Sequence, residues 1–186
     1  CMLAHDGANH EKKIAGTKLL EPKLDGVRCI TIVDVEAGTV TQYTRNGKVL
    51  ENFSHIADSL LTHIDSLGRS YVLDGEVVSK SFQDLMKQVH RKSNVQANDA
   101  VLHLFDYIPL RNFQKGAWDM PQTYRIAQLN KWKDSTGEFT PNIQCLDYEE
   151  VDLDSMVGQA RFKMINTNAI AGGYEGIMIK DPAAVY

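Results

Sequence analysis

The stretch Glu21–Arg28, with the sequence Glu-Pro-Lys-Leu-Asp-Gly-Val-Arg, decides how the rest of this chain is interpreted. Lys23, Asp25 and Arg28 bring an amine, a carboxylate and a guanidinium together within six residues. Gly26 permits a tight turn among them because glycine has no Cβ. A deprotonated lysine is an accepted covalent nucleophile, and an amine beside such a turn suits attack on a phosphorus atom. The alternative interpretation is a charged surface hairpin with no chemical role.

The composition is that of an ordinary globular chain. Of its 186 residues, 43% are hydrophobic and 24% are charged, so it fits one domain that needs no disulfide or metal to fold. Its start lacks the pattern of a signal peptide, and no apolar run is long enough to span a membrane. The three cysteines, at positions 1, 29 and 145, predict neither a disulfide framework nor a metal site. We therefore expect a cytoplasmic protein with no membrane partner.

The charges are unevenly distributed along the chain. The net charge of −4 argues mildly against binding to nucleic acid. Residues 138–154 contain six acidic residues and neither lysine nor arginine, whereas basic residues are denser in the stretch 87–92. Because a run of like charge is usually a solvated face, neither cluster identifies a partner by itself.

Hydrophobic alternation and turn residues predict an α+β fold. Strands are predicted at Leu19–Leu20, Val27–Val35, Thr39–Thr44, Tyr71–Ser79, Ala100–Ile108, Ile143–Leu146 and Gly176–Lys180. Helices are predicted at Phe53–Leu67, Phe82–Val89 and Asp119–Lys133, and from Asp152 or Asp154 to Asn168. Short connections favour antiparallel pairing, so we expect mixed and antiparallel sheets with helices packed outside them. A doubly wound nucleotide fold is disfavoured, because no glycine-rich turn leads from a strand into a helix and the Walker pattern is absent.

Four further clusters of polar residues lie in the predicted strands or at their ends. In the cluster Tyr174–Lys180, strand alternation places Ile177 and Ile179 on one face and Met178 and Lys180 on the other. The amine of Lys180 must then reach solvent or meet an anion, since an unpaired buried charge is costly. Taken singly, each cluster also has the composition of a solvated strand end. The clusters are Tyr43–Gly47, Leu73–Val78 with two carboxylates around an interrupting glycine, Leu104–Tyr107 and Tyr174–Lys180.

The order of these clusters along the chain resembles a known family. The series K-x-D-G-x-R, R-N-G, D-G-E, F-D and E-G-x-x-x-K is similar to the adenylation domain of ATP-dependent DNA ligases, especially the compact bacteriophage type. In this order, the segments match nucleotidyltransferase motif I, the family's early arginine turn, and motifs III, IIIa and IV. The similarity also includes Met2–Ala4 and Lys180–Pro182. The resemblance implies an ATP-grasp-like nucleotidyltransferase domain over residues 1–186. It also implies that Lys23 attacks the α-phosphate of ATP, carries AMP and passes it to the 5′-phosphate of a DNA nick.

The resemblance implies roles for single residues at the nucleotide. Lys23 would be the nucleophile, and Glu21 would recognise the exocyclic amine of adenine. Phe105 would stack on adenine, a use that suits an aromatic ring. Arg28 would hold the ribose and phosphate region, and Lys180 would lie by the α-phosphate. The implied nucleotide-binding set is Glu21, Lys23, Leu24, Arg28, Glu76, Phe105, Glu175 and Lys180.

Metal and DNA contacts are implied by the same resemblance. Glu76 matches the motif III glutamate, at the ribose or a metal, and Glu175 matches the motif IV acid that supports a divalent ion. Carboxylates are hard oxygen ligands that suit Mg²⁺. Arg45 and Asn46 match a turn that contacts the 5′-phosphate side of a nick, and Asp25 is assigned to support of the backbone turn. We expect ATP and Mg²⁺ as cofactors, and nicked double-stranded DNA as the partner of a monomeric enzyme.

The family also has parts without a counterpart in these residues. Motif V, with its lysine pair, and a C-terminal OB-fold domain would follow Tyr186. We therefore expect an excised or truncated catalytic domain that adenylates itself slowly and seals nicks poorly, in the bacterial host cytoplasm if a phage encodes it. The alternatives are an RNA ligase or an mRNA capping guanylyltransferase, which GTP or RNA ends would indicate, whereas Glu21 favours ATP. A non-catalytic nucleic-acid-binding module is disfavoured because Lys23 is retained.

Overall fold

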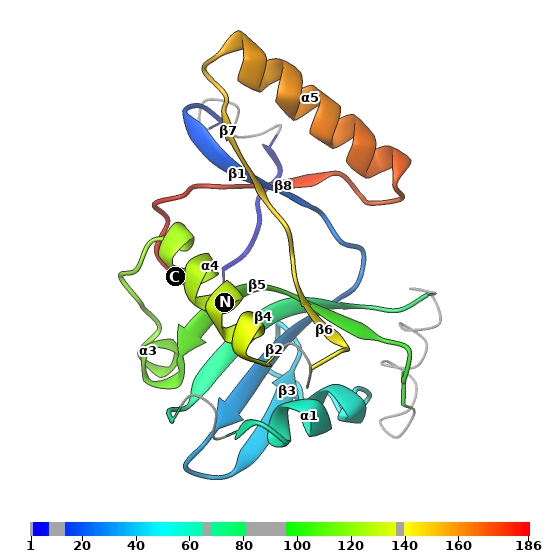
Figure 1. Ribbon diagram of the computed structural model, residues 1–186, viewed down its shortest axis with the longest axis vertical. Helices are drawn as coiled ribbons and strands as arrows, with labels where there is room; N and C mark the ends of the chain where they lie inside the picture. The colour runs from blue at the N-terminus through cyan, green and yellow to red at the C-terminus, as the bar shows by residue number, and fades with distance from the viewer. Residues whose placement is uncertain (1, 8–13, 65–67, 81–95, 137–139) are drawn as a thin grey trace. The chain divides into compact units, whose positions relative to one another are not determined.

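The computed structural model describes residues 2–7, 14–64, 68–80, 96–136 and 140–186, and the chain divides into two compact units (Figure 1). Unit 1 comprises residues 1–25, 119–123 and 146–186, and unit 2 comprises residues 26–118 and 124–145. None of the helices in the described ranges is long and apolar enough to cross a membrane. The described strands are β1 (Thr17–Pro22), β2 (Val27–Asp34), β3 (Thr39–Tyr43), β4 (Tyr71–Val78), β5 (Val101–Pro109), β6 (Ile143–Cys145), β7 (Glu149–Asp152) and β8 (Ile177–Lys180). The described helices are α1 (Ser54–Leu61), α3 (Leu110–Lys115), α4 (Gln122–Thr136) and α5 (Met156–Ala171).

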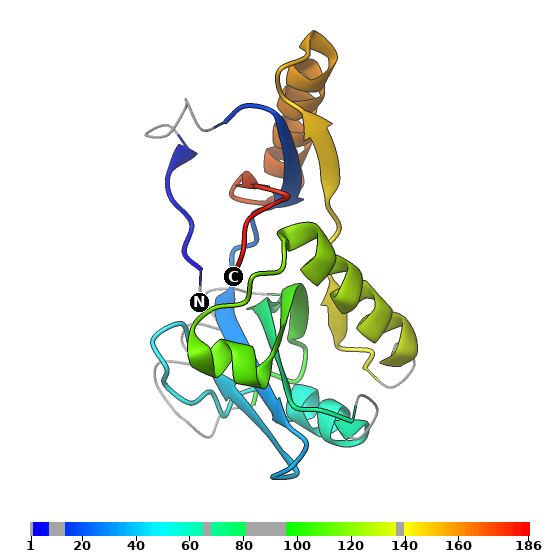
Figure 2. The ribbon, with the colours of Figure 1, turned by 90° about the vertical axis from the view of Figure 1, so that its left-hand side faces the viewer.

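Unit 1 is built on a three-stranded antiparallel sheet with the order β7-β1-β8. Helix α5 lies along this sheet (Figure 2). Leu20 of β1 pairs with Ile179 of β8, and both pack in an apolar cluster with Phe162 of α5. Strand alternation places Glu21 and Lys180 on the opposite face, so the predicted division of the last strand into an apolar and a charged face is confirmed.

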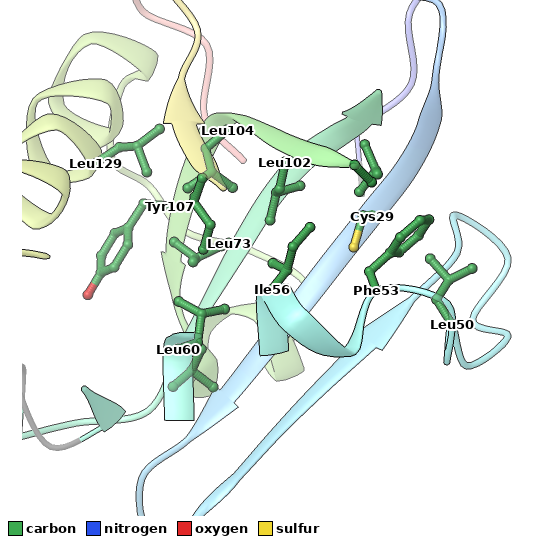
Figure 3. Close-up of a cluster of buried hydrophobic side chains, with 14 of the residues drawn as sticks. Cys29, Leu50, Phe53, Ile56, Leu60, Leu73, Leu102, Leu104, Tyr107 and Leu129 are labelled. Carbon is green, nitrogen blue, oxygen red and sulfur yellow. The ribbon is translucent and has the colours of Figure 1, made fainter. Parts of the chain in front are cut away.

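Unit 2 is built on a five-stranded mixed sheet with the order β3-β2-β4-β5-β6, in which β5 and β6 run parallel and the other pairs antiparallel. One face carries the main hydrophobic core (Figure 3). Phe53, Ile56 and Leu60 at the start and on the inner face of α1 are buried against this sheet, and α4 adds Leu129 and Trp132. The sheet contributes alternate residues of its central strands, among them Cys29, Leu73, Val77, Leu102 and Leu104.

All seven predicted strands are present, and the structure adds β7, which the sequence did not indicate. Three of its four residues are acidic, and Asp and Glu are depleted in strands. As an edge strand β7 keeps acidic side chains in solvent, and Glu149 bonds to Arg161 of α5, with Nε–Oε1 and Nη2–Oε2 distances of 2.5 and 2.6 Å. This hydrogen bond from Arg161 lowers the pKa of the Glu149 carboxyl. Part of the acidic run is therefore a strand rather than a solvated loop.

The predicted start of the last helix is wrong. Helix α5 begins at Met156, and its N-cap is Ser155, whose Oγ accepts the N–H of Gly158 at 2.9 Å. Asp152 belongs to β7, so neither Asp152 nor Asp154 caps the helix. Serine and aspartate are both good N-caps, so residue type alone did not distinguish these positions.

The other helices differ from the prediction in their bounds. Helix α1 ends at Leu61 rather than at Leu67, and α4 begins at Gln122 and continues to Thr136. The six-residue helix α3 was not predicted, because it follows the Pro109 end of a strand without any linker. The predicted helix at 82–89 lies outside the described residues.

Candidate active site

Lys23 follows β1 directly and is held within unit 1 by the segment that precedes β8. Its N–H donates to the Gly176 carbonyl at 2.9 Å, and its own carbonyl accepts the N–H of Glu175 at 3.2 Å. The Lys23 ammonium also forms an ion pair with the Glu175 carboxylate. The two side chains are 44% and 43% exposed, so a ligand can reach the amine. Motifs I and IV therefore meet through both backbone and side chains.

A second ion pair in unit 1 joins Lys180 and Glu21. The Lys180 Nζ lies 2.6 Å from Oε2 of Glu21, whose side chain is only 2% exposed. The register pairs Leu19 with Lys180, so Glu21 is a diagonal neighbour of Lys180 on the same face. Of the two environments that the sequence allowed for Lys180, solvent or an anion, the structure shows an anion from its own chain.

In unit 2, Arg28 on β2 is oriented by Asp74 on β4. Its Nε donates to Oδ1 of Asp74 at 2.6 Å, and its Nη2 donates to Oδ2 at 2.7 Å. Two parallel bonds of this kind fix the plane of the guanidinium, and Asp74 is fully buried beneath it. Glu76 is the direct cross-strand neighbour of Arg28 and shares its face. The orientation of Arg28 by Asp74 was not predicted. Asp74 and Glu76 are two residues apart on one strand and so share a face, which could have indicated it.

Phe105 occupies a β-bulge between β4 and β5. The register pairs Asp74 with Asp106 and Gly75 with Leu104, so Phe105 is the extra residue of β5 at this point. Bulges bend a strand and redirect side chains. The Cζ atom of Arg28 lies 4.6 Å from the centroid of the Phe105 ring, a cation–π contact. The ring is therefore on the charged face of the sheet, while Leu104 points into the core.

Two other titratable side chains near these strands are neutral at pH 7. Burial lowers the pKa of His103, the β5 partner of Glu76. Burial raises the pKa of the Cys29 thiol to about 12, and this side chain has no exposed surface. A buried, protonated thiol is not a nucleophile, so Cys29 does not compete with Lys23 for that role.

Gly26, in motif I, begins unit 2 and passes very close to β4. A Cβ at this position would lie 2.3 Å from the Val77 carbonyl oxygen and 2.9 Å from Cγ of Glu76. We expect Gly26→Ala to lower the free energy of unfolding by about 1–3 kcal/mol, the usual cost of overpacking, measured by urea denaturation. The matched control is Gly172→Ala, where the nearest atom is 3.2 Å away. Equal losses in the two variants would contradict a special constraint at Gly26.

Arg45 and Asn46 lie in an exposed turn that follows β3 in unit 2. The N–H of Thr44 donates to the Lys48 carbonyl at 2.7 Å, and the N–H of Gly47 donates to the Thr44 carbonyl at 2.9 Å. Gly47 has a φ of +77°, which favours glycine. The turn holds both predicted DNA-binding side chains in solvent.

The predicted site residues fall into two sets, and each unit supplies one of them. Glu76 and Glu175, the predicted metal ligands, belong to different sets. Among the described residues, no three His, Cys, Asp or Glu side chains gather as a metal site. Either carboxylate alone suits Mg²⁺, which commonly takes one or two carboxylates and completes its shell with phosphate oxygens and water. Unit 1 supplies Glu21, Lys23, the half-buried Leu24, Glu175 and Lys180, and unit 2 supplies Arg28, Arg45, Asn46, Glu76 and Phe105.

Sequence reasoning missed a buried ion pair beside Phe105. Arg125 of α4 donates from Nε to Oδ1 of Asp106 at 2.8 Å and from Nη2 to Oδ2 at 3.0 Å. Arg125 has no exposed surface and Asp106 is 2% exposed. Arg125 falls in the helix predicted over Asp119–Lys133, and no signal in either local sequence indicates its pairing with Asp106.

Comparison with known proteins gives a consistent result. The family model described as the ATP dependent DNA ligase domain matches residues 1–186. A DNA ligase of Halobacterium salinarum is 28% identical over 181 residues, which cover 90% of this chain and 29% of that protein. The solved structure Pmar-Lig_Pre is 52% identical, with a TM-score of 0.95, over 100% of this chain and 43% of that one.

A more distant structure shows likeness of fold alone. The ATP-dependent DNA ligase from bacteriophage T7, in complex with ATP, has a TM-score of 0.70 at 21% identity, over 99% of this chain and 62% of that one. By the coverages given above, the chain spans less than a third of the length of the Halobacterium relative and less than half of that of Pmar-Lig_Pre. Because the family model covers the whole sequence, this chain belongs to the ATP-dependent DNA ligase domain family.

Proposed function

We propose that this chain is the nucleotidyltransferase part of an ATP-dependent DNA ligase and that Lys23 carries AMP. The Lys23 Nζ would form a bond to the α-phosphorus of ATP, the bond from that phosphorus to the pyrophosphate oxygen would break, and the amine would lose a proton. The observation that supports this most is the placement of Lys23, whose backbone and amine both contact Glu175–Gly176 while the side chain stays accessible. A nucleophile positioned in this way has already lost much of its freedom of motion before ATP binds.

The ion pair with Glu175 sets a condition for this reaction. An ammonium group has no lone pair, so Lys23 can attack only after the pair opens and the amine is deprotonated. Glu175 contacts the amine and is the nearest proton acceptor that the structure shows for it. Glu175 and Glu76 are the residues that would hold Mg²⁺, which supplies neutralisation of phosphate charge when bound.

The remaining nucleotide contacts are proposed from chemistry and placement. Phe105 offers an aromatic face for adenine, and Arg28 a guanidinium for the ribose and phosphate region. In unit 1, Lys180 offers a cation for phosphate and Glu21 an acceptor for the adenine amine, while Leu24 directly follows Lys23. Together with Glu76, these residues would form the nucleotide site of an ATP-grasp-like nucleotidyltransferase.

The DNA step rests on family membership and on one surface feature. We propose that Arg45 and Asn46, in their exposed turn, contact the 5′-phosphate side of a nick in double-stranded DNA. Sealing would also draw on the family's motif V and OB-fold domain. We therefore expect a protein of residues 1–186 to adenylate itself better than it seals nicks. A monomer of the compact bacteriophage type, acting in a host cytoplasm, stays the prediction for the whole enzyme.

Nucleotide and nucleic-acid choice tests this function. The purified protein is incubated with Mg²⁺ and with ATP or GTP labelled at the α-phosphate, and then mixed with nicked DNA or nicked RNA. We expect label from ATP on the protein, followed by transfer to the 5′-phosphate of nicked DNA. Label from GTP, or transfer to RNA ends alone, would instead favour the capping enzyme or the RNA ligase.

A further inference from the structure

The buried pair of Arg125 and Asp106 lies next to the bulge that carries Phe105. Both residues of the pair belong to regular secondary structure, because Asp106 is on β5 and Arg125 is near the start of α4. Besides Arg125, Oδ1 of Asp106 accepts the N–H of Tyr107 at 2.9 Å. Helix α4 is itself fixed in the core by Leu129 and by Trp132, whose Nε1 donates to the Tyr71 hydroxyl at 3.1 Å. The pair therefore ties the bulged strand to a helix that packs in the core.

The pair acts on the backbone beside the bulge, because Asp106 is the residue that directly follows Phe105. Moving the register of a strand by one residue turns its side chains to the opposite face of the sheet. If the extra residue moved to position 106, Phe105 would become the direct partner of Asp74, and its ring would lose the bulged direction that brings it beside Arg28. A bidentate arginine–carboxylate pair is directional, so it favours the register in which Asp106 lies opposite Asp74 and meets Arg125.

We propose that Arg125 is a positioning residue for the nucleotide reaction: through Asp106 it fixes the bulge that holds the Phe105 ring beside Arg28. This inference rests on the proposed function, in which Phe105 stacks on adenine. It goes beyond that function by assigning a role to a fully buried side chain that is not in the predicted nucleotide-binding set.

A double-mutant cycle tests the inference. The variant Asp106→Leu/Arg125→Met replaces both charges with apolar groups of similar size, a change that buried ion pairs often tolerate without unfolding. We expect KM for ATP in Lys23 adenylation to rise by about tenfold, the effect of losing one base–aromatic stack, with kcat changed by less than about twofold. In a Phe105→Ala background the same double variant should cause no further rise, because Arg125 acts only through that ring. The matched control is Tyr71→Phe, which breaks the bond to Trp132 in the same core and should leave KM unchanged.

Two results would overturn the inference. One is an unchanged KM in a folded Asp106→Leu/Arg125→Met protein, and the other is an equal rise in the wild-type and Phe105→Ala backgrounds. A crystal structure of the double variant gives a readout that needs no nucleotide: we expect the bulge to leave position 105, and an unmoved bulge would also contradict the role. If the wild-type protein acquires no AMP, the proposed function fails, and this crystallographic readout still judges the role of Arg125.

Discussion

Replacing Lys23 by arginine is expected to abolish transfer of AMP to the protein, with a loss of at least about 1,000-fold in rate. The guanidinium remains protonated in proteins, so it can keep the ion pair with Glu175 but cannot attack phosphorus. The expected result is a folded protein without covalent nucleotide. The measurement is label retained on denatured protein after incubation with ATP labelled at the α-phosphate.

The control for this variant is Lys18→Arg, on strand β1, which directly precedes Lys23. Lys18 forms an ion pair with Asp181 at 3.5 Å and has no proposed part in the reaction. The Lys18→Arg protein should retain label at the wild-type level. If Lys23→Arg also retained label, the nucleophile would be another residue and the role assigned to motif I would be wrong.

The second large effect is on stability and concerns Arg125. Arg125→Met alone leaves the Asp106 carboxylate buried without its cation, and we expect a loss of about 3–5 kcal/mol in the free energy of unfolding. Adding Asp106→Leu should recover most of that loss, because it removes the uncompensated charge. Urea denaturation followed by circular dichroism measures both changes.

An exposed pair of similar geometry provides the comparison. Arg161 and Glu149 also form two short bonds, but both side chains lie at the surface, 45% and 39% exposed. Water replaces the lost partner at such a site, so Arg161→Met should change stability little. A similar loss at Arg125 and Arg161 would show that burial of the first pair is not what makes it matter.

The strands and motif residues of this chain were predictable because their signals are local. Alternation along Tyr71–Ser79 and Gly176–Lys180 is visible within a few residues, and both segments are strands in the structure. The assignment of Ile179 and Lys180 to opposite faces needed only the two-residue period of a strand.

The partners of charged residues were not predictable, because they depend on how distant segments pack. The types of Lys23 and Glu175 indicated chemistry, yet their direct contact depends on the pairing of β1 with β8. The Arg125–Asp106 pair joins a helix to a strand, and nothing in either local sequence indicates it. The acidic strand β7 shows the same limit, since its pairing with β1 overrides its low strand propensity.

The most direct test of the account is the intact mass of the protein after incubation with ATP and Mg²⁺, followed by peptide mapping. We predict one added adenylyl group, located on Lys23 and removed by pyrophosphate. An unchanged mass, or an adenylyl group on any residue other than Lys23, would contradict the central claim.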